Sequence, residues 1–500
     1  MPDQTPFPKA DVCMILEGTY PYITGGVSQW AHDLIRSQEG LTFSLVCLLA
    51  PGSALKMRYE VPKNVVGIKN IVLQEFPHAS EILSLHERKQ FFKDLEVPLL
   101  NIQHKPTLDS LKKVLQLLNE RKGAMSPALL LNSEEAWRMV QRMYLSTMGE
   151  SSFLNYFWSW RSLLGSFYSA MLAELPLAGV YHTLCTGYAG LFMARAFIET
   201  GRPSIVTEHG IYMNERKIEI TSAEWIEDQK AMNLNLEKRR FDRDLKSLWI
   251  DTFAAYSKFC YESCQKIITL YEGNRELQIA DGADLSKLVI IPNGVDYDLY
   301  SQIIRKPTPA PTVGFIGRVV PIKDVKSLIR SIAILREKIP TIKTLIIGAT
   351  NEDEDYYKEC QELVQTNQLE ETITFTGKVN VKDLLPSIDV LALTSISEAQ
   401  PLVILEAGAA GIPSVATNIG ACSEMLYGRS DELPPLGMGG LICQLANPES
   451  VAKNLFTLLS DKNLYQKCSQ TIKERVKSYY NQVDVKNAYK KLYEELLSGV

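Results

Sequence analysis

Histidine is scarce in this sequence and absent from its second half. There are six histidines in 500 residues, and all of them lie before residue 210. Any histidine chemistry must therefore come from the first half of the chain. The nine cysteines are odd in number and scattered, which excludes a disulfide framework and indicates a reducing compartment.

A strong excess of charge of one sign is also missing. The 53 basic and 58 acidic side chains leave a net charge of -5, which excludes a general surface for nucleic acid. The first ten residues lack the basic start and apolar core of a signal peptide, and polar residues interrupt the least polar stretch, 175–198. We expect a cytoplasmic protein that reaches a membrane only through a partner.

What is present is an ordinary globular composition, 46% hydrophobic and 22% charged. The first half begins with two apolar runs, 11–18 and 41–50, on either side of a segment with helical spacing, 27–38. We expect strand, glycine-bearing loop, helix and strand, which is a βαβ unit. Residues 75–161 are polar and helical, and we interpret them as a helical insertion. Strand-like runs return after it.

The second half contains a clearer alternation of strands and helices. It begins at residue 312, directly after a segment with three prolines, 301–311. We therefore predict domains at 1–305 and 306–482, followed by a final helix, 483–500, that packs back on the first domain. The predicted fold class is α/β, with two doubly wound, Rossmann-like domains facing a central cleft.

Two basic residues follow the first strand of the second domain. Arg318 and Lys323 lie on the loop after 312–317, where ligands of open α/β sheets bind. A guanidinium and an ammonium at this place can hold a diphosphate and neutralise the charge that grows on it as a leaving group. The alternative is a pair of solvated charges at the start of a helix.

Two glutamates, Glu398 and Glu406, are eight residues apart around the start of a predicted helix. The first N–H groups of that helix, on Leu402 and Val403, can face a phosphate, while Glu398 reaches a sugar and Glu406 a ribose. The alternatives are a charge that complements the helix dipole for Glu398 and a solvated side chain for Glu406.

The first domain offers a glycine pair and two histidines. Gly25 and Gly26 precede a predicted helix, where exposed N–H groups can receive a phosphate, although a tight turn explains them equally well. His182 and His209 follow strand-like runs, which aims them at the predicted cleft. Asp296 with Asp298 forms a D-x-D pattern, a metal-binding signature in many sugar-nucleotide enzymes, but here we interpret it as part of a structural turn.

Four segments in this order resemble the retaining glycosyltransferases of family 4, which have the two-domain GT-B fold: TYPYITGGVSQW, IPNGVD, GRVVPIKD and SEAQPLVILEAGAAGIP. More narrowly, LEGTYPYITGGVSQW, TEHGIYMNERK and the insertion resemble the PelF-like glycosyltransferases of Pel exopolysaccharide synthesis. This narrower resemblance covers nearly the whole chain.

The resemblance implies a retaining transferase with a UDP-sugar donor, no metal and no other cofactor. It assigns the donor diphosphate to Arg318 and Lys323, the sugar to Glu398 and the ribose to Glu406. A first-domain histidine near the anomeric centre is assigned to His182, with His209 and the preceding Glu208 as the alternative. The resemblance further implies phosphate contacts and base contacts, which fall on Gly25, Gly26, Gly377, Lys378 and Val379.

The implied acceptor is a growing polysaccharide, and the implied partners are inner-membrane Pel synthase and exporter subunits. No carboxylate is clearly placed as a nucleophile, so a front-face reaction suits these residues better than a double displacement. Two alternatives stay open. One is a nucleotide-sugar-binding scaffold subunit without turnover, which would not need all four charged residues, and the other is a GT-B-like UDP-sugar epimerase.

Overall fold

The computed structural model describes residues 7–148, 152–223, 226, 244–306 and 309–499, and its internal contacts divide it into two units. The first unit contains Met1–Thr269, Arg275–Val289 and Tyr489–Val500, and the second contains Leu270–Asn274 and Ile290–Ala488. The second unit thus begins before the predicted boundary at 305/306. Residues 290–305 belong to it because they bond to it, as where the Val295 N–H donates to the Tyr480 carbonyl at 2.8 Å.

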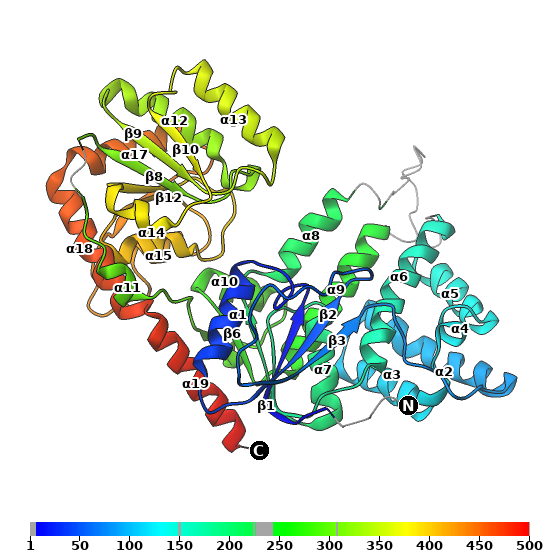
Figure 1. The fold of residues 1–500 in the computed structure, drawn as a ribbon. Coiled ribbons are helices and arrows are strands. Elements are labelled where there is room, and N and C mark those ends of the chain that lie inside the picture. Colours follow the sequence, from blue (N-terminus) through cyan, green and yellow to red (C-terminus); the bar gives the residue numbers. More distant parts are fainter. Residues whose placement is uncertain (1–6, 149–151, 224–225, 227–243, 307–308, 500) are drawn as a thin grey trace. The chain divides into compact units, whose positions relative to one another are not determined.

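Although residues 270–274 and Ile290 fall in the second unit, the elements before residue 291 lie mainly in the first (Figure 1). Its strands are β1 (Ala10–Glu17), β2 (Phe43–Leu49), β3 (Val65–Val72), β4 (Ala178–Thr183), β5 (Ser204–Glu208), β6 (Lys266–Thr269) and β7 (Leu288–Ile290). Its helices are α1 (Gly26–Ser37), α2 (Leu85–His104), α3 (Leu108–Glu120), α4 (Pro127–Leu130), α5 (Glu134–Thr147), α6 (Phe153–Leu172), α7 (Tyr188–Thr200), α8 (Tyr212–Ser222), α9 (Leu245–Ser263) and α10 (Glu272–Ala280), with short turns η1 (Lys122–Ala124) and η2 (Leu285–Lys287).

The first sheet has the strand order β3-β2-β1-β4-β5-β6-β7, and the pairings from β3 to β6 are parallel. All seven residues of β2 are buried, as expected for a parallel sheet covered by helices on both faces. The order reverses direction between β1 and β4. This is the topological switch point of a doubly wound sheet, so the strand ends beside it are where a ligand binds.

The helical insertion runs from α2 to α6, somewhat later than the predicted 75–161. Its first helix starts at a capping box, in which Ser84 and Glu87 each accept from the other's backbone N–H. The insertion packs against α7 and α9, and buried side chains such as Phe91, Leu115 and Trp160 join the core of the sheet. It is therefore an integral layer of the first unit.

The remaining elements build the second unit (Figure 1). Its strands are β8 (Thr312–Ile316), β9 (Lys343–Ile347), β10 (Ile373–Gly377), β11 (Val390–Leu393), β12 (Ser414–Thr417) and β13 (Gly440–Cys443). Its helices are α11 (Tyr297–Ser301), α12 (Val325–Lys338), α13 (Glu354–Thr366), α14 (Val381–Leu384), α15 (Leu402–Ala409), α16 (Cys422–Tyr427), α17 (Pro448–Ser460) and α18 (Lys462–Tyr479), with η3 (Pro321–Lys323) and η4 (Leu385–Ser387).

The second sheet is parallel throughout, in the order β10-β9-β8-β11-β12-β13. Its switch point lies between β8 and β11. One apolar cluster packs under α12 and α17, and another surrounds α15. Two doubly wound units are therefore present, which confirms the predicted α/β class with two Rossmann-like domains.

The last helix, α19 (Gln482–Ser498), starts in the second unit and belongs to the first from Tyr489 onward. Tyr489 and Tyr493 are fully buried, and their hydroxyls bond to Thr207 on β5 and to His182 on β4. The C-terminal helix is thus part of the first unit's core. In the described part of the chain, no helix is both long enough and apolar enough to span a membrane.

Candidate functional site

The switch point of the second unit carries an ion pair. Lys323 ends η3 after β8, and Glu398 follows β11, the neighbouring strand. The Lys323 ammonium donates to Glu398 Oε1, and the Ser395 hydroxyl donates to the same oxygen at 2.8 Å. The two charged side chains are 20% and 16% exposed. A cation and a carboxylate therefore meet, half buried, where doubly wound sheets bind ligands.

The loops that hold this pair are bonded to each other. The Ile396 N–H donates to the Ile322 carbonyl at 2.8 Å, and the Thr394 hydroxyl donates to the Lys323 carbonyl at 3.1 Å. Gly420, with φ of 48°, approaches so closely that an added Cβ would lie 2.1 Å from the Glu398 carbonyl oxygen. The site is preorganised by its own backbone.

Arg318 lies on the same loop but is far more open. Its guanidinium pairs with Glu352 at 2.7 Å, and the two side chains are 56% and 44% exposed. An ion pair in this much solvent is weak, so the guanidinium is available to a ligand at little cost.

Helix α15 supplies an open N-terminus beside the Glu398 loop. It starts at Leu402, after Pro401, and no side chain caps its first turn. The Leu402 side chain is 39% exposed and Val403 is half buried. Glu406 lies just over one turn further on, where burial raises the pKa of its carboxyl group. The helix end leaves N–H groups without a capping side chain, which suits an anion.

The loop after β10 lies at the same edge of the sheet. Gly377 has φ of 68°, a left-handed conformation that favours glycine, and its carbonyl accepts from the Gly348 N–H at 3.0 Å. Lys378 and Val379 follow it and are exposed. The structure thus brings the predicted residues of β8, β10 and β11 to one edge of one sheet.

The D-x-D pair lies in a helix start. Asp296 caps α11 by accepting from the Leu299 N–H at 3.0 Å, and Asp298 lies in the first turn. Among the described residues, no group of three or more histidine, cysteine, aspartate or glutamate side chains could hold a metal ion.

In the first unit, the glycine pair lies where it was predicted. Gly25 is the N-cap of α1 and Gly26 its first residue, and no side chain caps this end. Both are exposed, and an added Cβ on either would meet nothing within 4 Å. The open backbone leaves room for a ligand at these N–H groups.

His182 is not where it was predicted. It lies inside β4, opposite Met14 on β1, and is completely buried. Its Nδ1 is 2.6 Å from the Tyr493 hydroxyl and its Nε2 is 2.9 Å from the Thr207 hydroxyl, so both ring nitrogens are used. Burial lowers the pKa of His182 to about 3. The prediction that His182 follows the end of its strand is wrong, because the strand extends past it to Thr183. Its complete burial disfavours contact with a ligand.

His209 meets the prediction better. It directly follows β5 and its ring packs edge-on against Trp30 of α1, with the ring centres 4.6 Å apart. Its Nε2 is buried and has no hydrogen-bond partner in the described part of the chain. Burial lowers the pKa of His209 to about 4. A neutral imidazole with an unsatisfied nitrogen is a place where a ligand group gains a hydrogen bond.

Glu208, one residue earlier, has a different environment. Its carboxylate accepts from the Tyr261 hydroxyl at 2.5 Å and from the Gln278 amide at 2.7 Å, and only 1% of the residue is exposed. Burial raises the pKa of Glu208 to about 7. It holds α9 and α10 to the sheet and is remote from solvent.

Two residues of the site were missed by sequence analysis. Ser395 precedes Glu398 by three residues, a spacing that could have been noticed because hydroxyls often bond to a nearby side chain. Tyr300 donates to Glu406 Oε1 at 3.0 Å from 106 residues away in the sequence, and no local pattern announces it.

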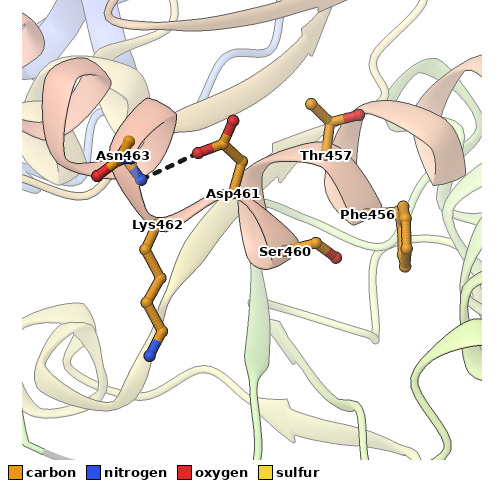
Figure 2. Close-up of a pocket in the computed structure, with 6 residues that line it drawn as sticks. All are labelled: Phe456, Thr457, Ser460, Asp461, Lys462 and Asn463. Atoms are coloured by element: carbon orange, nitrogen blue, oxygen red, sulfur yellow. Dashed lines mark hydrogen bonds between the residues drawn. The ribbon is translucent and has the colours of Figure 1, made fainter.

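A hollow of about 560 Å³ lies elsewhere in the second unit, between α17 and α18 (Figure 2). Asp461, the N-cap of α18, lies in its wall and accepts from the Asn463 N–H at 3.0 Å. None of its lining residues is a predicted site residue, and we assign it no role.

Two protein-family models match the two halves of the chain. Residues 10–286, more than half of the chain, match the family described as domain of unknown function (DUF3492), and residues 296–475 match the family described as glycosyl transferases group 1. The chain belongs to the DUF3492 family, whose model covers more than half of it. Its second half is similar to the glycosyl transferases group 1 family over residues 296–475.

Curated relatives match part of this chain. An N-acetyl-alpha-D-glucosaminyl L-malate synthase from Bacillus anthracis is 26% identical over 177 residues, 35% of this chain and 43% of the relative. A D-inositol 3-phosphate glycosyltransferase from Arthrobacter sp. (strain FB24) is 30% identical over 159 residues, 29% of this chain and 37% of the relative. The matched region thus spans less than half of either relative.

Solved structures share the fold over the whole chain. A sucrose-phosphate synthase from Thermosynechococcus elongatus has a TM-score of 0.58 at 15% identity, covering 98% of this chain and 100% of its own. HepE of Anabaena in complex with UDP has a TM-score of 0.57 at 14% identity, with the same coverage. These likenesses show that this chain has the GT-B fold.

Proposed function

We propose that the protein is a retaining glycosyltransferase that moves a sugar from a UDP-sugar to a growing exopolysaccharide of the Pel type. The observation that carries the proposal is the Lys323–Glu398 pair at the switch point of the second sheet, beside the uncapped N-terminus of α15. Cationic and N–H donors for a diphosphate lie next to a carboxylate suited to sugar hydroxyls. HepE, a structural neighbour, was solved with UDP, with UDP and glucose, and with UDP-glucose.

Each residue has a part in this proposal. Arg318 and Lys323 bind the donor diphosphate and stabilise the negative charge that it gains on leaving. Glu398 accepts from hydroxyls of the transferred sugar, and Glu406 accepts from the ribose. Because Lys323 and Glu398 are paired beforehand, the donor replaces an existing charge interaction and neither group is left buried without a partner.

The reaction needs one bond to break and one to form on the same face of the sugar. The bond from the anomeric carbon to the UDP oxygen breaks, the acceptor oxygen bonds to that carbon, and the acceptor proton passes to the departing phosphate. In the first unit we assign His209 to this step in place of His182, because His209 ends a strand and its Nε2 lacks a partner.

The Pel assignment rests on TYPYITGGVSQW, TEHGIYMNERK and the insertion. We propose that the enzyme works beside inner-membrane synthase and exporter subunits, which would hold the acceptor chain. Fractionation of cells with and without those subunits tests the idea. Membrane association that depends on them supports recruitment, and an equal distribution in both strains contradicts it.

The activity is tested by incubating purified protein with a panel of UDP-sugars and measuring release of the nucleoside diphosphate, with the matching ADP- and GDP-sugars as controls. We expect UDP release from at least one UDP-sugar and no release of ADP or GDP from the controls. Binding of UDP without turnover on any sugar would favour the scaffold alternative. Conversion of the sugar without UDP release would favour the epimerase.

A further inference from the structure

A tyrosine outside the four motifs contacts helix α15, which the proposed function places at the nucleotide. Tyr300 lies on the short helix α11, and its hydroxyl donates to Glu406 Oε1 on α15 at 3.0 Å. The other oxygen of that carboxylate, Oε2, makes no hydrogen bond in the described part of the chain. The Tyr300 ring is half buried, and the Lys382 ammonium lies 5.7 Å from its centre.

We propose that Tyr300 is a positioning residue that holds the Glu406 carboxylate for the ribose of the nucleotide, with Oε1 engaged by the tyrosine and Oε2 free to accept from the ribose hydroxyls. This inference rests on the proposed function. It adds Tyr300 to the donor site. It also predicts that loss of the Tyr300 hydroxyl weakens binding only of ligands that carry the ribose hydroxyls.

The electrostatic surroundings explain why the carboxylate needs such a partner. Burial raises the pKa of Glu406, which favours the protonated acid, while the Tyr300 hydroxyl and the Lys382 charge act in the opposite direction. A protonated acid loses one acceptor position, whereas a carboxylate accepts charge-assisted hydrogen bonds from hydroxyls. Tyr300 therefore orients Glu406 and favours its ionised form.

A role limited to packing can be separated from this one. Helix α11 is held independently by its Asp296 cap and by Lys473, whose ammonium donates to the Ser301 carbonyl at 3.3 Å. Tyr300→Phe keeps the ring and removes only the hydroxyl, so the helix should stay in place. Tyr297→Phe is the matched control, because the Tyr297 hydroxyl on the same helix makes no hydrogen bond in the described part of the chain.

The test is calorimetric titration of the full-length protein with UDP and with 2′,3′-dideoxy-UDP. We expect Tyr300→Phe to weaken UDP binding by about threefold to tenfold, as for one lost hydrogen bond to a charged group. Its affinity for the dideoxy ligand should equal that of the wild type, and Tyr297→Phe should change neither. As the pH is lowered, the UDP affinity of Tyr300→Phe should begin to fall at a higher pH than that of the wild type, because Glu406 protonates more readily without the hydroxyl.

A double variant tests whether Tyr300 acts through Glu406 or whether its substitution disturbs the site in general. In a Glu406→Gln background, adding Tyr300→Phe should change UDP affinity no further, since the group it positions is gone. Equal UDP affinity in wild type and Tyr300→Phe overturns the inference, as does an equal loss for UDP and its dideoxy analogue. A wild-type protein that binds neither nucleotide overturns the proposed function itself, which is a separate result.

Discussion

The two units present their candidate residues in different ways. In the second unit the charged side chains lie on loops after the strands, from the half-buried Lys323–Glu398 pair to Arg318, which is 56% exposed. In the first unit the two histidines lie among aromatic rings, and His182 has no exposure at all. Burying a charged side chain is costly unless it contacts water or an opposite charge, whereas a neutral imidazole can be buried with hydroxyl partners. The type of a residue therefore predicts its exposure at a strand end more reliably in the second unit, where the candidates are charged, than in the first.

The largest expected effect is on turnover and concerns Glu398 in the second unit. Glu398→Gln keeps the size of the side chain but removes the charge that, in the proposed function, faces the transferred sugar. We expect turnover to fall by about 10²–10³, as when one contact made in the transition state is lost. UDP affinity should stay the same or rise, because UDP has no sugar to contact and Lys323 loses a competing partner. Turnover and UDP affinity are measured on one preparation, and full activity in this variant would refute the role of Glu398.

The next effect separates the two histidines. His209→Ala should lower turnover by about 10²-fold and leave UDP affinity unchanged, if His209 acts only in the transfer step. His182→Gln should instead lower the melting temperature, because Tyr493 and Thr207 each lose a buried partner, at a cost of about 1–3 kcal/mol each. Its turnover per folded molecule should stay near that of the wild type. Loss of turnover in His182→Gln together with full turnover in His209→Ala would restore His182 as the residue that acts in the transfer step.

A pH series tests the burial of His182 directly. Its pKa is lowered from 6.5 to about 3, so between these values the unfolded chain binds a proton that the folded chain does not. Stability from this residue is present above pH 6.5 and is lost as the pH falls toward 3, by up to about 1.4 kcal/mol per pH unit. Urea unfolding at pH 7, 6 and 5 should show this loss in the wild type and a smaller loss in His182→Gln. Equal slopes would contradict the assignment.

The smallest effect concerns the D-x-D pair. Asp296→Ala removes the cap of α11 and should cost about 1 kcal/mol in the free energy of unfolding. UDP release from the donor should persist in EDTA for both the wild type and this variant. Activity that is lost in chelator and returns with magnesium or manganese would instead assign the pair to a metal.

Much of the fold could be predicted from sequence, and so could the positions of several candidate residues at strand ends. The apolar runs of β8, β10 and β11 show where these strands end, so Lys323, Gly377 and Glu398 were placed correctly on the edge of the second sheet. The boundary at 305/306 was late because proline content marks a loop, while hydrogen bonds such as that of Val295 decide which unit a loop joins.

The partners of the site residues could not be predicted, because they come from distant segments. Tyr493 reaches His182 across 311 residues, and Tyr300 reaches Glu406 across 106. The periodicity of a sequence indicates which face of an element is buried, but it does not identify the residue that meets it. Choosing between His182 and His209 needed the exact end of β4, and strand ends are the least certain part of such a prediction.

The most direct test of the account is the dissociation constant of UDP for three forms of the protein: wild type, Lys323→Ala and Lys326→Ala. Lys326 is a matched control, since it lies three residues further on and pairs with Glu359 of α13. We predict that UDP binds the wild type and Lys326→Ala equally and Lys323→Ala about tenfold or more weakly, as expected for a lost charge-assisted contact. No binding to the wild type, or the same affinity in all three forms, would contradict the central claim that this edge of the second sheet holds the donor diphosphate.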